Sequence, residues 1–231
     1  MGRYPRGTRA HVLCQRALHG GASECADRRP AGGRYRGGGC VTSTTPKVIT
    51  TGTLIRLREK HIDDAPRDYE WRKDPELAEY DAARPMTMPY RNFLATMTDD
   101  LSYPSSYRRT FAIEDIATAR HIGNVMYYGY DPMLQEAELG ITIGDREYWS
   151  RGFGTDTVRT MLQYLFDDRG LRRVYLHTLS WNYRAQTAFG RAGFRRTRHV
   201  RRDGYDFEQM ECLRASWSPD GEPAEDASPQ G

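Results

Sequence analysis

The stretch AELGITIGDREYWSRGFGTDTVRTMLQYLF, residues 137–166, carries the pattern that decides the fold of this chain. Its first residues predict a strand, and Gly152 and Gly154 then lead into a segment whose apolar residues recur every three or four positions: Val158, Met161, Leu162, Leu165 and Phe166. That spacing places them on one face of a helix. Glycines between a strand and a helix N-terminus let backbone N–H groups close on an anion, and the helix dipole favours phosphate there.

The glycine pair matches no nucleotide-hydrolysis motif, because no Lys followed by Ser or Thr comes after Gly154. A dinucleotide-binding fingerprint is also incomplete. A Gly-x-Gly alone more often marks a tight turn. The following unit strengthens the anion-site interpretation, since a predicted strand at 173–180 is followed by Asn182 and by Ala-Gly-Phe at 192–194.

The rest of the central segment predicts a mixed α/β domain in which strands outnumber helices. A helix over 63–74 begins near an Asp cap with a proline in its first turn. The other predicted helices cover 89–98 and 183–192, and the other predicted strands cover 52–58, 109–115, 121–131, 136–145, about 194–201 and 205–214.

Charge and composition divide the chain into three parts. Residues 1–48 hold nine Gly and a net charge of +7, residues 49–215 are neutral, and residues 216–231 carry a net charge of −4. We expect a disordered Gly/Arg-rich extension, one domain and a disordered acidic tail. The extension has three competing interpretations: a basic tail that binds a partner, an Arg-rich targeting sequence, or translation from a start site placed too far upstream.

Several classes of protein are disfavoured. No apolar run approaches the ~18 residues of a membrane span, and no secretory signal is recognisable. The four cysteines, Cys14, Cys25, Cys40 and Cys212, form no disulfide framework, which indicates reduced thiols and a cytoplasmic protein. A zinc site from the first three cysteines and His19 matches no known spacing, so no metal is expected.

Several motifs that follow one another in the same order and at matching spacing make residues 53–214 resemble the GNAT superfamily of acyl-CoA N-acyltransferases, especially its RimJ/RimL-like branch. The resemblance includes LIRLRE, WRKDPEL, HIGNV, AELGITIGDREYWSRGFGTD, RRVYLHTLSWNYRAQTAFGRAGF and DGYDFEQM. It implies a mixed, largely antiparallel sheet whose central strands splay to admit acetyl-CoA. It also implies direct acetyl transfer to a primary amine, on a small molecule such as a polyamine or on a protein N-terminus. Apart from the resemblance, a homodimer is a candidate assembly.

The resemblance also places the cofactor. The family's pyrophosphate loop reads Gln/Arg-x-x-Gly-x-Gly/Ala, and Trp149 replaces its polar first residue here. The backbone of strand residues 141–143 is expected to pair with the pantetheine arm as a neighbouring strand would. Asn182 is expected either to form a hydrogen bond with the same arm or to cap the helix that follows it. The predicted cofactor-binding residues are Ile141, Thr142, Ile143, Trp149, Ser150, Arg151, Gly152, Phe153, Gly154, Thr155, Asn182 and Arg191.

Two residues are candidates for the base that removes a proton from the amine. Glu138 occupies the place of a base glutamate in histone acetyltransferases of the superfamily, and His177 the place of one in ribosomal-protein acetyltransferases. Alternatively, Glu138 is a strand residue in an ion pair, and His177 is a packed strand histidine.

The usual general acid of the family, a tyrosine, is Phe189 in this chain. Ser180 and Tyr183 are nearby in sequence, and nothing chooses between them. The missing tyrosine keeps open a second hypothesis, a non-catalytic acyl-CoA-binding sensor or regulatory module.

Two charge clusters remain. Residues 63–81 hold eight acids against three bases, which suits either a cationic acceptor or a solvated helix face. Residues 195–202, RRTRHVRR, would meet a CoA phosphate, an acidic acceptor or RNA. No aromatic residues interleave with these arginines, so nucleic acid is a disfavoured partner.

Overall fold

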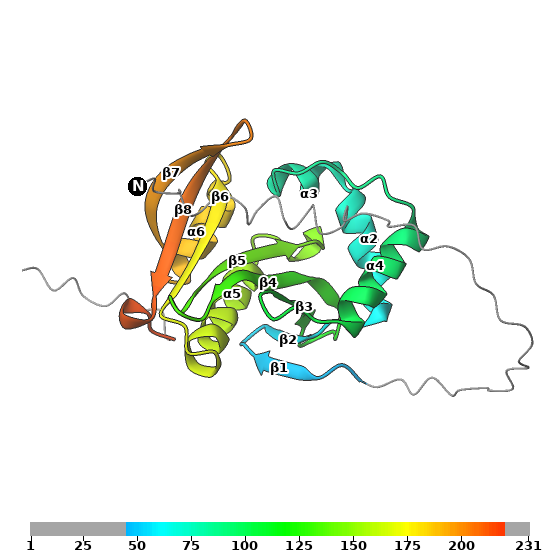
Figure 1. Cartoon of the computed structure of the whole chain (residues 1–231), viewed down its shortest axis with the longest axis horizontal. Coiled ribbons are helices and arrows are strands. Elements are labelled where there is room, and N and C mark those ends of the chain that lie inside the picture. The colour runs from blue at the N-terminus through cyan, green and yellow to red at the C-terminus, as the bar shows by residue number, and fades with distance from the viewer. Residues whose placement is uncertain (1–44, 220–231) are drawn as a thin grey trace, which may run out of the picture. The chain divides into compact units, whose positions relative to one another are not determined.

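The structure, a computed structural model, describes residues 45–219. The candidate zinc ligands Cys14, His19, Cys25 and Cys40 and most of the two terminal extensions lie outside the described residues. The described strands form one sheet in the order β1-β2-β3-β4-β5-β6-β8-β7 (Figure 1). Their bounds are β1 (Val48–Thr51), β2 (Ile55–Glu59), β3 (Arg109–Asp115), β4 (His121–Asp131), β5 (Glu136–Ile143), β6 (Arg173–Leu179), β7 (Arg195–Arg202) and β8 (Tyr205–Leu213).

Helices lie in the connections between β2 and β3, between β5 and β6, and between β6 and β7. Asp74 ends one helix and caps the next, because its carboxylate accepts the backbone N–H groups of Glu76 and Leu77. The helices are α2 (Ala65–Lys73), α3 (Pro75–Tyr80), α4 (Tyr90–Ser102), α5 (Phe153–Gln163) and α6 (Tyr183–Arg191), with a π-helical turn at Tyr164–Asp168 and short 3-10 turns at Ile62–Asp64, Arg146–Tyr148 and Arg214–Ser216.

The strand pairing confirms a mixed, largely antiparallel sheet that splays at its centre. Every neighbouring pair is antiparallel except β5 and β6, which are parallel. Only Glu136–Glu138 pairs with Arg173–Tyr175, although β5 continues to Ile143 and β6 to Leu179. Beyond the paired rungs β6 runs away from β5 at a steep angle (Figure 1).

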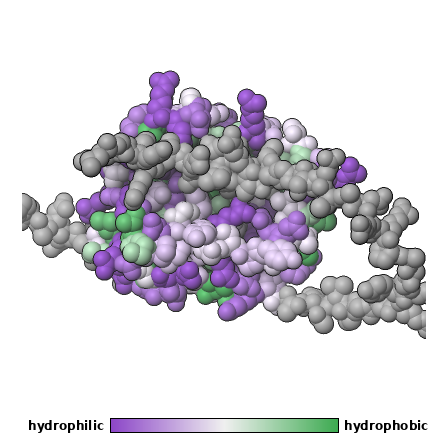
Figure 2. All heavy atoms as spheres, viewed as in Figure 1, coloured by the Kyte–Doolittle hydropathy of each residue, from purple (hydrophilic) through white to green (hydrophobic). Residues whose placement is uncertain are grey.

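The strand register divides the side chains between two faces. On one face Leu57, Phe111, Val125 and Leu139 are buried in the main core, together with the apolar stripe of α5 predicted from the sequence. A smaller cluster unites Ala65 of α2 with Phe93 and Met97 of α4. The face in Figure 2 is mostly hydrophilic, with apolar groups in small separate patches, as expected when the large side chains fill these cores.

Two short elements were not predicted, and the domain extends slightly past both expected boundaries. β1 and α3 have too few residues for a periodic signal. β1 begins at Val48, one residue before the expected domain start. Trp217, placed by the sequence in the acidic tail, is 7% exposed and packs on Phe166 with ring centroids 5.4 Å apart. The ordered domain therefore runs at least to this tryptophan.

A single carboxylate ties α5 to the turn between β1 and β2. Asp156 accepts the backbone N–H groups of Thr53 (3.1 Å), Leu54 (2.8 Å) and Ile55 (3.1 Å). A Cβ on Gly52 would meet the Thr160 hydroxyl at 2.3 Å, so only glycine allows this close approach. The first turn of α5 is thus held in place by a segment more than 100 residues away in the sequence.

Replacing Asp156 by Ala is expected to lower the free energy of unfolding by about 2 kcal/mol. Hydrogen bonds to a charged group are worth about 1.5–3 kcal/mol each when buried, and water replaces the exposed ones in part. Urea denaturation measures the change. Asp168→Ala, just beyond α5, is the matched control. A loss below about 0.5 kcal/mol for Asp156→Ala would show that the turn holds without this carboxylate.

Candidate active site

The two candidate bases lie together where β5 and β6 begin to separate. Glu138 is on the last paired rung of β5, and His177 is two residues beyond the last paired rung of β6. His177 Nδ1 is 2.8 Å from Glu138 Oε1. Glu138 is 2% exposed, and the His177 side chain is 9% exposed. The alternative interpretation of Glu138 expected an arginine as its partner, but the contact shown is with the other candidate base. The catalytic roles of both residues stay predictions.

Two tyrosines complete the surroundings of this pair. Tyr128 of β4 and Tyr175 of β6 are the register partners of Glu138 on either side. Burial and the charges of Glu138 and Glu136 raise the pKa of Tyr175 to about 12, although the charge of Arg173 opposes them. Tyr175 is therefore a neutral phenol at physiological pH. Its place could have been found in the sequence, since strand alternation puts residues 175 and 177 on one face.

The predicted pyrophosphate loop forms the N-terminus of α5. Gly152 is the N-cap, with a φ of 89° that favours glycine, and within the described residues no side chain caps this helix. The first N–H groups of a helix have no intrahelical partner, so those at this end can bind an anion. Ser150, Arg151, Phe153, Gly154 and Thr155 adjoin this cap in sequence. Arg151 bonds the Glu147 carbonyl at 3.0 Å, and Phe153 is buried in the core.

Trp149, the residue that departs from the family pattern, turns toward the end of β5. Its Nε1–H donates to the Ile143 carbonyl at 2.7 Å. The guanidinium of Arg184 lies 3.8 Å from the centre of the indole ring. One carbonyl of the strand predicted to pair with pantetheine thus already accepts a hydrogen bond from the loop. Ile141, Thr142 and Ile143 all pair with β4 on their other side.

Asn182 caps α6, as one of its two interpretations predicted. Its Oδ1 accepts the Ala185 N–H at 3.2 Å, and the residue is 9% exposed. The bond uses the side-chain oxygen, and a cofactor role through the amide stays a prediction. Arg191 lies at the opposite end of this helix, and its carbonyl accepts a hydrogen bond from Arg159 at 2.7 Å. The structure therefore does not bring Arg191 beside Asn182.

No tyrosine stands at the family's general-acid position. Phe189 is 8% exposed and packs on Phe194 with ring centroids 6.0 Å apart, so it serves the core. Tyr183 is 71% exposed, and the Ser180 backbone bonds Asp206 of β8. Cys212 is buried in the core, where burial raises the pKa of its thiol to about 12. Such a thiol is a poor nucleophile, which fits direct attack by the amine.

Half of the eight acids of residues 63–81 are paired with Arg or Lys side chains from other elements. Asp64 binds Arg58 and Asp68 binds Lys60, both in buried pairs. Arg146 bonds both Asp74 and Glu76 at 2.7 Å. The segment is therefore neither a free acidic rim nor a simple solvated helix face. On β7, similarly, His199 and Arg201 contact Asp206 of the neighbouring strand.

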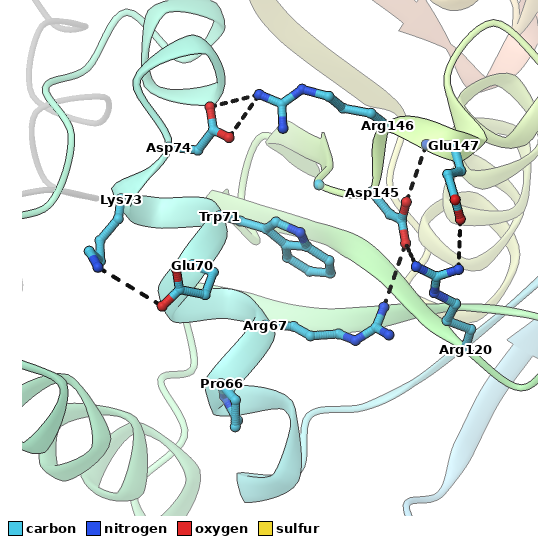
Figure 3. A pocket seen from close by; sticks show the side chains of 11 residues that line it. Pro66, Arg67, Glu70, Trp71, Lys73, Asp74, Arg120, Asp145, Arg146 and Glu147 are labelled. Atoms are coloured by element: carbon cyan, nitrogen blue, oxygen red, sulfur yellow. Dashed lines mark hydrogen bonds and ion pairs between the residues drawn. The ribbon is translucent and has the colours of Figure 1, made fainter.

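An open hollow of about 810 Å³ lies between α2 and the segment after β5 (Figure 3). The Trp71 indole forms one wall and lies directly against Gly144, where a Cβ would meet the ring at 2.1 Å. Asp145 faces Arg120 at 2.7 Å and Arg67 at 3.6 Å. The charge of Asp145 is therefore balanced by these two arginines. Neither Glu138 nor His177 lines the hollow.

Residues 45–219 offer neither a metal site nor a helix that could span a membrane. No group of three or more His, Cys, Asp or Glu side chains there is arranged to hold a metal ion. In the same range, every helix is too short or too polar to cross a membrane.

Comparison with known proteins identifies the family. The profile of the family described as Acetyltransferase (GNAT) domain matches residues 55–195, more than half of the chain. An uncharacterized N-acetyltransferase, p20, of Bacillus licheniformis is 28% identical over 121 residues, which are 52% of this chain and 67% of the relative. The chain belongs to the GNAT acetyltransferase family and is an N-acetyltransferase. The sensor hypothesis is not favoured.

Solved structures agree on the fold. Spermidine N-acetyltransferase from Vibrio cholerae, in complex with CoA and spermine, has a TM-score of 0.62 and 20% identity over 70% of this chain and 96% of that one. A GNAT-family acetyltransferase from Bacillus anthracis has a TM-score of 0.60 and 14% identity, covering 71% of this chain and 97% of that one. At such identities the likeness shows the fold alone.

Proposed function

We propose that this enzyme transfers an acetyl group from acetyl-CoA directly to a primary amine, with His177 as the base and Glu138 as the residue that orients it. The observation that carries the assignment is the 2.8 Å contact between Glu138 and His177 Nδ1 at the point where β5 and β6 separate. A carboxylate on Nδ1 selects the imidazole tautomer whose Nε2 carries the lone pair. That nitrogen would take the proton from the amine.

Each residue of the pair has a distinct task. An alkyl ammonium has a pKa near 10.4, so at neutral pH a proton must leave before its nitrogen can attack. His177, the less buried partner, accepts that proton directly or through one water. Glu138, almost fully buried, stabilises the imidazolium that results. Tyr175, the register partner of Glu138 on β6, remains a neutral phenol beside them.

The residues around the splay, the gap that opens where β5 and β6 stop pairing, fit acetyl-CoA, whose thioester is the acetyl donor. The N-terminus of α5 at Gly152 and the guanidinium of Arg151 would hold its phosphates. The backbone of Ile141 to Ile143 would face its pantetheine arm, because β6 does not pair with that part of β5. Asn182 would bond the same arm. Arg191 has weaker support, because it lies at the far end of α6.

The acceptor is proposed to be a primary amine on a small molecule. The acids of residues 63–81 lend little support to a polycationic acceptor in particular, because four of them already form ion pairs with Arg58, Lys60 or Arg146. A polyamine is one member of this small-molecule class, and a protein N-terminus is the competing acceptor. We further propose a RimJ/RimL-like branch from the quoted motifs and a cytoplasmic location, since the described cysteine is a free thiol. A homodimer is a further proposal.

The test uses the full chain in two steps. Calorimetric titration of acetyl-CoA is expected to show saturable binding near one per chain. Release of free thiol is then followed with spermidine, an aminoglycoside and a peptide with a free N-terminus. Turnover with any of these amines, and none with an N-blocked peptide, supports the proposal. A folded protein that neither binds acetyl-CoA nor releases thiol would overturn it.

A further inference from the structure

A group of side chains spans the open end of the splay, the gap where β5 and β6 separate, and none of them is assigned to proton transfer. Trp149 comes from the loop before α5, Tyr80 from the end of α3, and Trp181 and Arg184 from the segment that begins α6. We call these four residues the aromatic bridge. Tyr80 contacts both indoles, with ring centroids 5.7 Å from Trp149 and 5.3 Å from Trp181.

Arg184 is the centre of the aromatic bridge. Its guanidinium lies 3.8 Å from the ring centre of Trp149 and 4.9 Å from that of Tyr80. Arginine over an aromatic face is attracted by the ring quadrupole, most strongly over tryptophan. Within the described part of the chain no carboxylate forms an ion pair with this guanidinium, so the aromatic rings are its partners there.

The bridge continues to the strand that would hold the cofactor. The Trp149 N–H donates to the Ile143 carbonyl at 2.7 Å, at the last residue of β5. A continuous path therefore runs from the end of β5 through Trp149 to the first turn of α6, next to Asn182. On the β5 side, Arg146 also approaches the indole at 5.6 Å while it binds Asp74 and Glu76, so that α3 is held against the same loop.

We propose that Arg184 is a positioning residue for the cofactor. By stacking on Trp149 it joins the open ends of β5 and α6, and so sets the width of the splay and the orientation of the loop before Gly152. This inference rests on the proposed function, because it assigns the splay to acetyl-CoA. It explains how tryptophan can replace a polar residue in this loop: the loop is held by a guanidinium–indole stack in place of a polar side chain.

The proposal predicts a loss of cofactor affinity without a loss of chemistry. Replacing Arg184 by Ala in the full chain is expected to raise the Kd and the KM for acetyl-CoA about tenfold, the scale of a partly desolvated cation–π contact. The kcat at saturating acetyl-CoA should stay within twofold, because His177 and Glu138 are unchanged. Arg184→Lys keeps a cation over the ring and should recover part of the affinity.

Two further variants separate this role from general packing. Trp149→Phe keeps a ring for the guanidinium and removes the N–H to Ile143, so its loss of affinity should be smaller. Arg169→Ala removes another guanidinium–aromatic contact, 5.5 Å from Tyr130, beyond the opposite end of α5, and should leave Kd and KM unchanged. Thermal melts check that every variant is folded. If Arg184→Ala does not fold, the lysine and phenylalanine variants still provide the affinity comparison.

The outcomes are distinguishable. Wild-type Kd in a folded Arg184→Ala protein, or a fall in kcat with unchanged KM, would overturn the positioning role and leave the proposed function standing. If the wild-type chain itself binds no acetyl-CoA, the proposed function falls, and the inference falls with it.

Discussion

Replacing His177 by Gln is expected to lower kcat at neutral pH about 10²–10³-fold, while the Kd for acetyl-CoA stays within twofold. General-base catalysis typically contributes 10²–10⁴-fold, and glutamine cannot accept the proton that imidazole accepts. The residual rate should climb steeply as the pH approaches about 10, because the amine then loses its proton without help. Steady-state thiol release across this pH range measures both effects.

The division of labour between the two residues can be tested with the same assay. Glu138→Gln should cost less than His177→Gln, since the imidazole remains and only its orienting charge is lost. The double variant should be no slower than His177→Gln alone, because groups that act as a unit are not additive. His199, an exposed histidine 3.3 Å from Glu208, offers a matched control, and His199→Gln should keep full activity. A severe loss in Glu138→Gln beside a mild one in His177→Gln would make Glu138 the base.

Replacing Asp64 by Ala is expected to have the largest effect on stability, lowering the free energy of unfolding by about 3 kcal/mol. Asp64 receives two hydrogen bonds from Arg58, at 2.7 and 2.9 Å, and one from the His61 N–H at 2.9 Å. Removing one partner of a buried pair leaves an uncompensated charge and costs about 3–5 kcal/mol. The lower end applies because Arg58 keeps its bond to Glu114.

Urea denaturation at pH 7 measures this change, with Asp100→Ala as the control. Asp100 forms an exposed pair with Arg108 at 2.8 Å, so its removal should cost less than about 1 kcal/mol. Equal losses in the two variants would mean that the buried pair contributes no more than an exposed one.

Acid should reduce the difference between wild type and Asp64→Ala. Burial alone would raise the pKa of Asp64, but the hydrogen bond from Arg58 and the charges of Lys60 and His121 outweigh it and hold the pKa well below its usual range. The folded chain then binds fewer protons than the unfolded chain. The contribution is therefore complete above the ordinary value of 3.8 and is lost as the pH falls through the lower folded pKa.

Local sequence features predicted most of the fold. The apolar stripe of α5 has a helical period, the strands β2 to β6 and β8 carry apolar residues between turns, and Gly152 stands where a positive φ is required. Such signals can be recognised without the tertiary structure, because they depend only on residues that are close together in the chain. β1 and α3 were not predicted, because their four and six residues are too few to show a strand or helix period.

The candidate site was predicted as a set of residues but not as an arrangement. Glu138 and His177 were alternatives in the sequence, and the parallel pairing of β5 with β6 makes them partners across 39 positions. Arg191 was grouped with the cofactor loop, yet helix length carries it to the far end of α6. No sequence pattern pointed to Arg184, because its proposed role depends on its contact with Trp149 from another loop.

The sequence by itself determined the family, the glycine loop at the start of α5 and the two candidate bases, since each is written in short segments with regular spacing. Only the tertiary structure decided which charges neutralise one another: the acids of residues 63–81 meet Arg58, Lys60 and Arg146 from distant or separate elements. It also decided how Trp149 is used. Contacts between segments far apart in sequence depend on the packing of the whole sheet, and no local pattern records them.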